Sequence, residues 1–334
     1  MNIAILYTEP TKRAKASAFI ETDEDTIESA REVAKAISDK GSTPILVGLS
    51  EDAIEKTICG IKADCIVNLI DWTGLDLPLS LGAMDVLESI GIPFTGASRK
   101  AFELGADKIA MKRHLDANNL PTPRWQLFEN GKENIRNDFV YPVIVKLAKE
   151  HCSIGLGKAS IVNNSKELIV LVAKQLITYH EPVIAEEFIS GREFQITLLE
   201  KETGLTMLPP AEVTYKVKGT RAMLSYESRW VERSPDFHTS GMALAKLTDD
   251  QLKEFEKICK DAFHAFGFTD FTRIDARLND KGEFMILEAN ANPGLSDHPL
   301  YGMTVSYKAS GMTFADFVWE NKRLLLPRLR SGSQ

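Results

Sequence analysis

Four polar residues near the C-terminal end of the chain have types and a spacing that suit the binding of a metal ion together with phosphates. Arg273 and Asp275 stand two residues apart in one apolar run, and Glu288 and Asn290 stand two apart in the next. Residues 279–282 between the runs, Asn-Asp-Lys-Gly, predict a β-hairpin. Because strand side chains alternate between faces, each pair shares a face, and the hairpin sets Glu288 across from Arg273 and Asp275.

Two carboxylates and an amide on one sheet surface are hard oxygen ligands, which bind Mg²⁺ together with the phosphates of a substrate. The alternative is a surface hairpin with an ordinary salt bridge. The neighbouring residues favour the metal site because they are apolar and place the charges beside buried surface: Ile274, Phe284, Ile286 and Leu287. The sequence therefore predicts Asp275, Glu288 and Asn290 as metal ligands.

The composition is that of an ordinary globular protein, and it argues against some classes of function. The 334 residues exceed one usual core, so two or three packed units are expected. A net charge of −7 without a basic cluster interleaved with aromatics argues against nucleic acid. Apolar stretches are too short to span a membrane. Four cysteines without C-x-x-C spacing, and no secretory leader, predict a cytoplasmic protein.

Residues 1–96 alternate between short apolar runs and segments with helical periodicity. Apolar runs at residues 2–7, 44–49 and 64–70 predict buried strands, and each is followed by a predicted helix, at residues 26–40, from residue 51 and at residues 79–90. This alternation predicts an N-terminal α/β unit with a doubly wound parallel sheet.

The rest of the chain predicts a mixed α+β architecture in two parts. Residues 97–190 begin with a helix and continue as strand, strand, glycine-rich loop, strand, helix and strand. Residues 191–334 predict antiparallel strands, a long helix at residues 249–266, the hairpin and two closing helices. The polar and charged residues 214–237 show neither a helical nor a strand period and are expected to form a mobile lid.

A lysine and a glycine-rich loop predict a phosphate site in the middle of the chain. Residues 143–146 form an apolar run that ends at Lys146, and the loop at residues 149–157 includes Ser153. The backbone N–H groups of such a loop can approach phosphate oxygens closely, and glycine permits the approach. By itself, the loop fits an ordinary turn equally well.

The hairpin also carries a family resemblance. Residues 273–275 (Arg-Ile-Asp), 287–290 (Leu-Glu-Ala-Asn) and 292–294 (Asn-Pro-Gly) resemble the signature of the ATP-grasp ligases, and specifically of the D-alanine–D-alanine ligase family. In that family, R-x-D is followed by a hairpin and L-E-x-N-x-x-P-G. The resemblance covers residues 97–326 well and residues 1–96 only in architecture. It implies a two-part ATP-grasp fold after the N-terminal unit, with ATP and Mg²⁺, for which Mn²⁺ can substitute.

The resemblance assigns roles at the phosphates. It places Lys146 and Lys108 on the phosphates of ATP, and it places Ser153 in the loop that covers them. Arg273 would stabilise the oxyanion of a tetrahedral intermediate. Ser153 and Arg273 are therefore the predicted catalytic residues. Without the resemblance, Lys108 would be an ordinary exposed lysine at the start of a helix.

The resemblance also assigns the adenosine end of the nucleotide. Glu186 and the backbone beside it would bind the adenine amino group, with Glu187 and Ile189 next to them. Glu193 corresponds to the acid that binds the ribose. The alternative for residues 182–189 is an edge strand that carries surface acids.

The chain departs from the family pattern where the amino-acid substrates would bind. Glu9 does not clearly align with the family's glutamate for the first substrate's amine. Residues 68–76 replace H-G-x-x-G-E-D-G, and residues 150–155 are Glu-His-Cys-Ser-Ile-Gly where the family has E-G-S-S-x-G. Arg229, followed by a tryptophan, replaces the first member of a lysine–tyrosine pair, and Pro299 replaces the acceptor serine. Because the ATP-side residues are kept, we expect a different pair of substrates.

These features predict an ATP-dependent carboxylate–amine ligase that joins two amino acids or small peptides through an acyl phosphate. D-alanine–D-alanine ligase proper is the alternative within the family. A nucleotide-binding regulatory module without activity is the alternative of another class, and Arg273 argues against it because a binder needs no oxyanion arginine. The expected partners are small amino-acid or peptide substrates, without nucleic acid or membrane, and a homodimer is a possible assembly.

Overall fold

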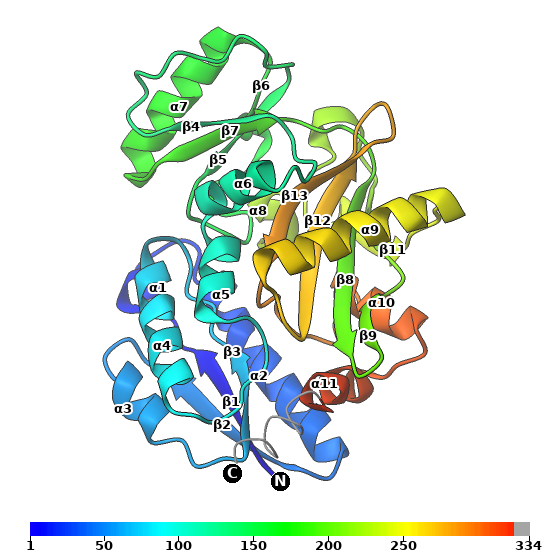
Figure 1. The fold of residues 1–334 in the computed structure, drawn as a ribbon. Coiled ribbons are helices and arrows are strands. Elements are labelled where there is room, and N and C mark those ends of the chain that lie inside the picture. The colour runs from blue at the N-terminus through cyan, green and yellow to red at the C-terminus, as the bar shows by residue number, and fades with distance from the viewer. Residues whose placement is uncertain (324–334) are drawn as a thin grey trace.

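The computed structural model describes residues 1–323, apart from the side chains of residues 21, 23, 24 and 321–323. This part of the chain forms three sheets with helices packed around them (Figure 1). The N-terminal sheet lies at one end of the molecule, a small sheet lies at the other, and the largest sheet lies beside both. The predicted unit boundaries after residues 96 and 190 stay predictions, and residues 324–334 of the last unit lie outside the described residues.

The N-terminal unit has the parallel, doubly wound sheet that the sequence predicts. Its elements are β1 (Asn2–Thr8), α1 (Lys12–Lys15), α2 (Glu21–Asp39), β2 (Thr43–Leu49), α3 (Ile54–Cys59), β3 (Cys65–Leu69), η1 (Gly74–Asp76) and α4 (Leu77–Ser89). The strand order is β2-β1-β3, with Ile3 opposite both Pro44 and Cys65. Ile3 and Ile5 pack toward α2 on one face, while Ala4 and Leu6 pack toward α3 and α4 on the other.

The small sheet carries one helix on one of its faces. Its elements are β4 (Trp125–Phe128), β5 (Val143–Leu147), η2 (Lys158–Ser160), β6 (Ile161–Val162), α7 (Ser165–Tyr179) and β7 (Val183–Glu187). The antiparallel order is β4-β7-β5-β6. Val143, Val145 and Leu147 pack into a core with Leu168 of α7. Strand alternation therefore turns Lys146 of β5 to the opposite face.

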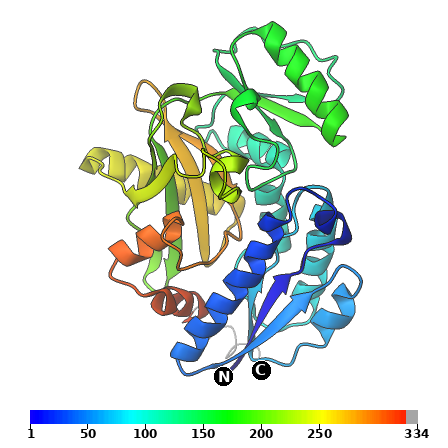
Figure 2. The same ribbon diagram turned by 180° about the vertical axis from the view of Figure 1, so that it is seen from behind.

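The largest sheet is antiparallel, in the order β11-β10-β8-β12-β13, with β9 paired to β8. Its elements and those that follow are β8 (Glu193–Lys201), β9 (Gly204–Met207), β10 (Ala211–Tyr215), η3 (Gly219–Arg221), α8 (Tyr226–Trp230), β11 (Ser240–Leu244), α9 (Asp249–Phe266), β12 (Phe271–Leu278), β13 (Phe284–Asn290), α10 (Gly302–Ala309) and α11 (Phe314–Arg323). Figure 2 shows α11 beside α2, so the C-terminal helix packs on the N-terminal unit. No helix within residues 1–323 is long and apolar enough to cross a membrane.

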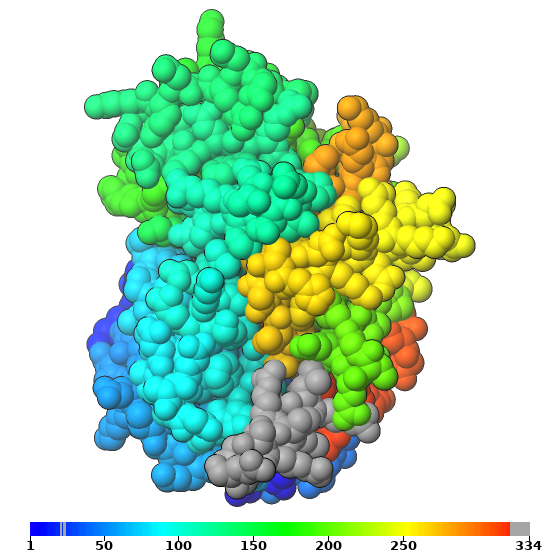
Figure 3. Space-filling model, in the orientation of Figure 1, coloured from blue at the N-terminus to red at the C-terminus, as the bar shows by residue number. Residues whose placement is uncertain are grey.

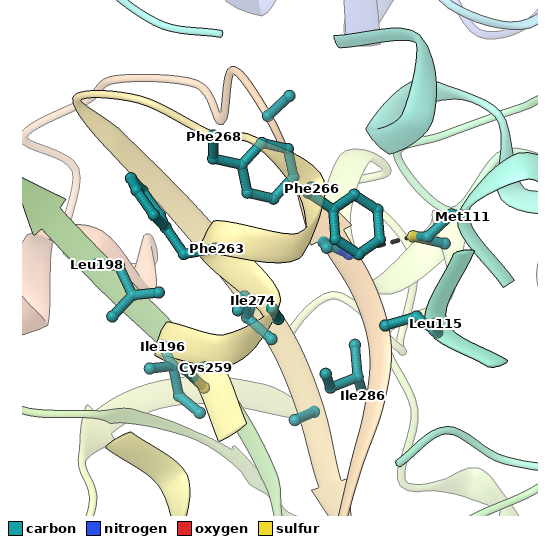
Figure 4. Close-up of a cluster of buried hydrophobic side chains, with 14 of the residues drawn as sticks. Met111, Leu115, Ile196, Leu198, Cys259, Phe263, Phe266, Phe268, Ile274 and Ile286 are labelled. Carbon is teal, nitrogen blue, oxygen red and sulfur yellow. Dashed lines mark hydrogen bonds between the residues drawn. The ribbon is translucent and has the colours of Figure 1, made fainter. Parts of the chain in front are cut away.

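The largest core fills the space between this sheet and the helices α5 (Arg99–Ala106), α6 (Lys108–Ala117) and α9. Phe263 and Phe266 of α9 lie over Ile274 of β12, and Met111 of α6 lies beside them (Figure 4). On the molecular surface, α9 lies against the segment of α5 and α6 (Figure 3). Because Ile274 faces this core, its neighbours Arg273 and Asp275 face the other side of the sheet.

Candidate active site

A cavity of about 200 Å³ is lined by residues on the polar faces of the largest and the small sheet and by residues of the N-terminal unit. The residues predicted for the site come from distant parts of the chain, and all of them line this one cavity: Lys108, Lys146, Ser153, Glu186, Glu187, Ile189, Glu193, Arg273, Asp275, Glu288 and Asn290. Their individual roles stay predictions. Because these residues converge on it, this cavity is the candidate active site.

The hairpin of β12 and β13 brings its four polar residues together. Asp275 pairs with Glu288, and Arg273 pairs with Asn290, across the two strands. Arg273 Nε donates to Asp275 Oδ1 at 2.7 Å, and its Nη2 donates to Oδ2 at 2.9 Å. Asn290 Nδ2 lies 3.4 Å from Asp275 Oδ2. An arginine, two carboxylates and an amide thus share one face inside the cavity.

The two carboxylates have different electrostatic surroundings. Glu288 Oε1 lies 2.8 Å from His151 Nδ1 and 3.6 Å from Lys108 Nζ. Burial alone would raise the pKa of Glu288, but Lys108 and His151 outweigh burial and lower this pKa well below its ordinary value. For Asp275, burial raises the pKa despite the opposing charge of Arg273. Glu288 is therefore the more firmly ionised of the two.

The donor set fits a divalent cation that arrives with phosphates. Among the described residues, no group of three or more His, Cys, Asp and Glu side chains is placed to hold a metal. Asp275 and Glu288 offer two carboxylates, and Asn290 adds an amide oxygen. Mg²⁺ is commonly bound by one or two carboxylates plus substrate phosphates and waters, not by a closed protein cage. The residues present match that kind of site.

Glu186 lies between two lysines elsewhere in the cavity wall. Lys112 Nζ lies 2.8 Å from Glu186 Oε2, and Lys146 donates to Oε1. The Glu186 and Lys112 side chains are 1% and 2% exposed. Burial disfavours the charge of Glu186, yet the two lysines lower its pKa to about 2. Lys112 is missing from the predicted set, although its position four residues after Lys108 puts both on one helix face.

Glu193 is held by a buried arginine and a tyrosine. Its Oε2 accepts hydrogen bonds from Arg277 Nε at 2.9 Å and from the Tyr215 hydroxyl at 2.6 Å. Arg277 Nη1 also donates to the carbonyl oxygen of Ile189 at 2.7 Å. Arg277 therefore fixes two of the predicted nucleotide residues. The sequence offers a signal for it, since Arg277 alternates with Arg273 and Asp275 along the same strand face.

The glycine-rich loop is tied to the predicted lid. Ser153 Oγ donates to the carbonyl oxygen of Leu224 at 2.8 Å, and Trp230 Nε1 donates to the carbonyl oxygen of Cys152 at 2.9 Å. Residues 214–237 are more regular than expected, because η3 and the five-residue helix α8 lie within them. A helix of this length is too short to show a period in the sequence.

A further group of polar residues lines the cavity beside the N-terminal unit. The Tyr301 hydroxyl donates to Asp25 Oδ2 at 2.6 Å, and Arg229 lines the same cavity. Burial raises the pKa of Asp25, and Tyr301 and Arg229 oppose the rise. Glu9 instead faces β2, where its Oε1 lies against Gly48, only 2.5 Å from the position that a Cβ would take if this glycine had one. Asp25 and Tyr301 are missing from the predicted set, and no sequence motif marks them.

The architecture, an α/β unit followed by two antiparallel sheets with a polar cavity between them, is that of an ATP-grasp enzyme. The crystal structure of D-alanine–D-alanine ligase from Bacillus anthracis complexed with ATP matches with a TM-score of 0.74 and 18% identity, over 100% of both chains. The VanG D-Ala:D-Ser ligase from Enterococcus faecalis matches with a TM-score of 0.74 and 17% identity, over 97% of this chain and 98% of that one. These matches establish the fold.

Sequence comparison establishes the family. The family model of the D-ala D-ala ligase C-terminus matches residues 116–321. The D-alanine–D-alanine ligase of Marinomonas sp. (strain MWYL1) is 30% identical over 235 residues, which are 70% of this chain and 69% of the relative. That of Acinetobacter baumannii (strain ATCC 17978) is 30% identical over 234 residues, 69% of this chain and 70% of the relative. This chain belongs to the D-alanine–D-alanine ligase family and is an ATP-dependent ligase that forms an amide bond.

Proposed function

We propose that this ligase joins two amino acids or small peptides through an acyl phosphate and releases ADP and phosphate. The observation that carries the proposal is the shared face of Arg273, Asp275, Glu288 and Asn290 inside the cavity. A protein that only binds nucleotide has no use for an arginine beside the metal carboxylates. An enzyme in which negative charge develops on a reacting oxygen does have such a use.

In the proposed reaction, a carboxylate oxygen of the first substrate attacks the γ-phosphorus of ATP, and ADP leaves. The amine of the second substrate then attacks the acyl carbon, loses a proton and expels phosphate. Arg273 stabilises the negative oxygen on the tetrahedral carbon. Lys108 and Lys146 neutralise the phosphates, and the loop that contains Ser153 covers them.

The nucleotide and the metal complete the proposed site. Asp275, Glu288 and Asn290 would hold Mg²⁺, or Mn²⁺ in its place. The ion would supply positive charge to the terminal phosphates. The adenosine would lie against the remaining predicted residues: Glu186, Glu187, Ile189 and Glu193. The fixed positions of Glu186 and Glu193 support this assignment, because buried ion pairs hold both side chains.

The residues beside the N-terminal unit point to amino-acid recognition that differs from the family pattern. The Asp25 carboxylate, oriented by Tyr301, is suited to bind the ammonium group of an amino acid, and Arg229 offers a positive charge to a carboxylate. Pro299, which stands in place of the acceptor serine, is not among the lining residues of the cavity within the described chain. We therefore propose a substrate pair other than two D-alanines.

We also place the enzyme in the cytoplasm as part of the proposal. No disulfide joins the cysteines of the described chain, as is usual in a reducing compartment: Cys59, Cys65, Cys152 and Cys259.

Phosphate release over a panel of paired L- and D-amino acids, with mass spectrometry of the products, tests the proposal. We expect an amide product and phosphate in equal amounts. For D-alanine with D-alanine, we expect kcat/KM at least about 10²-fold below that of the best pair, because one or two hydrogen bonds to charged groups, each worth about 1.5–3 kcal/mol, are lost. No phosphate release with any pair would contradict a ligase for amino acids. Robust D-alanyl-D-alanine synthesis unmatched by other pairs would favour D-alanine–D-alanine ligase proper.

A further inference from the structure

His151 stands at the glycine position of the family's E-G-S-S-x-G loop, and its ring links three parts of the site. Nδ1 lies 2.8 Å from Glu288 Oε1 on the hairpin, and Nε2 lies 2.6 Å from the carbonyl oxygen of Ala106 at the end of α5. Because a carbonyl oxygen only accepts, Nε2 donates in this contact. A glycine could form neither contact, so the link depends on the side chain of this residue.

Protein groups that carry N–H donors lie close to both carboxylates of the proposed metal site, and Asp275 is hydrogen-bonded to them, whereas Glu288 Oε1 accepts no hydrogen bond within the described residues. Arg273 donates to the two oxygens of Asp275 at 2.7 and 2.9 Å. His151 contacts Glu288 Oε1, and Lys108 Nζ lies 3.6 Å from the same oxygen. A divalent cation alone would have to displace these groups without offering them new partners. A cation that arrives with ATP brings phosphate oxygens, with which the displaced groups can pair.

The loop next to His151 has a conformation that needs support. Cys152 and Ser153 have φ values of 54° and 63°, in the left-handed region that residues other than glycine rarely adopt. Such residues persist where surrounding contacts hold them, and they are frequent at segments that switch. The contacts of His151 with Glu288 and Ala106 are among those that hold this loop.

We propose that His151 is a positioning residue that holds Glu288 and the loop in the nucleotide-free protein and releases both when ATP and a divalent cation bind together. The inference rests on the proposed function of the site. If His151 acts in this way, ATP and the divalent cation bind with positive coupling. Whichever ligand binds first displaces the His151 ring, so the second ligand binds at a lower free-energy cost. The protein then binds the cation weakly until the nucleotide is present.

The test is the affinity for Mn²⁺, measured by electron paramagnetic resonance with and without a non-hydrolysable ATP analogue. His151→Gly, which restores the residue of the family pattern, should bind Mn²⁺ at least about fivefold more tightly than the wild type when nucleotide is absent. The factor by which the analogue tightens Mn²⁺ binding should fall correspondingly. His298→Ala is the matched control, since His298 is a loop histidine that does not line the cavity, and it should leave both values unchanged.

The proposal would be overturned if His151→Gly, in the absence of nucleotide, bound Mn²⁺ as weakly as the wild type or more weakly. If circular dichroism shows that this variant is unfolded, His151→Asn replaces it. The shorter side chain cannot span both contacts, so the same rise is expected, and its absence would be equally decisive. Mn²⁺ binding needs no turnover, so the outcome stands apart from whether a substrate pair is found.

Discussion

Asp275 and Glu288 are direct partners across the antiparallel strands β12 and β13, which places two carboxylates next to each other in the cavity. Like charges in directly opposite positions destabilise a sheet. Arg273 on one side and Lys108 with His151 on the other offset this cost. Because neighbouring cationic groups must offset the repulsion between these two carboxylates, the pair is better explained by the chemistry of the site than by a contribution to the stability of the fold.

Glu288→Gln should abolish turnover and leave most of the nucleotide affinity. The substitution keeps the size of the side chain and removes one of the two negative charges offered to the metal, whereas adenosine would contact other residues. Calorimetric titration with ATP beside a phosphate-release assay measures both effects. Glu283→Gln, on an exposed residue of the same hairpin, should keep wild-type turnover. Near-normal turnover of Glu288→Gln would refute the metal assignment.

Lys146→Ala should raise the KM for ATP and lower kcat, together by about tenfold or more in kcat/KM, because it removes a charge from the phosphates. Lys174→Ala is the matched control, since Lys174 is an exposed lysine of α7 on the same small sheet and does not line the cavity. It should leave the ATP constants and the free energy of unfolding nearly unchanged. Steady-state kinetics and urea unfolding of both variants provide the comparison. ATP constants within about twofold of wild type in Lys146→Ala would show that Lys146 merely extends from a strand end.

The stability of the protein should depend on Glu186 in acid. Its pKa in the folded protein, about 2, lies below the ordinary value of 4.5. Its ionisation therefore stabilises the fold above pH 4.5, and this contribution is lost as the pH falls toward 2. The difference in unfolding free energy between the wild type and Glu186→Gln should shrink by up to about 3 kcal/mol over that range. Urea unfolding at pH 7 and pH 3.5 measures it, and an equal difference at both values would contradict the buried ion pair.

Residues 214–237 should behave as a lid that becomes ordered when ATP and substrate are both bound. The contacts of Ser153 with Leu224 and of Trp230 with Cys152 join this segment to the loop expected to cover the phosphates. Closure would keep water away from an acyl phosphate. Hydrogen exchange should slow in this segment when an ATP analogue and substrate are added together. Equally fast exchange with and without the ligands would count against a lid.

The sequence predicts this molecule best where the relevant residues are close along the chain. Local sequence patterns predict the apolar parallel strands, the long helix α9 and the hairpin around residues 279–282. These patterns are, respectively, apolar runs, helical periodicity and turn-forming residues. Asp25 and Tyr301 are 276 residues apart and meet only because the C-terminal part packs on the N-terminal unit. No local pattern encodes such a contact. Lys112 could have been identified from its spacing to Lys108, but its ion pair with Glu186 depends on how α6 packs against the small sheet.

Transfer of ¹⁸O from the first substrate to phosphate tests the central claim most directly. The carboxylate of the first substrate in the best pair is labelled at both oxygens, and the released phosphate is analysed by mass spectrometry. Formation of an acyl phosphate followed by attack of the amine requires one carboxylate oxygen to leave with the phosphate. The account therefore predicts one ¹⁸O atom in each phosphate, in proportion to the amide formed. Amide formation with unlabelled phosphate would contradict it.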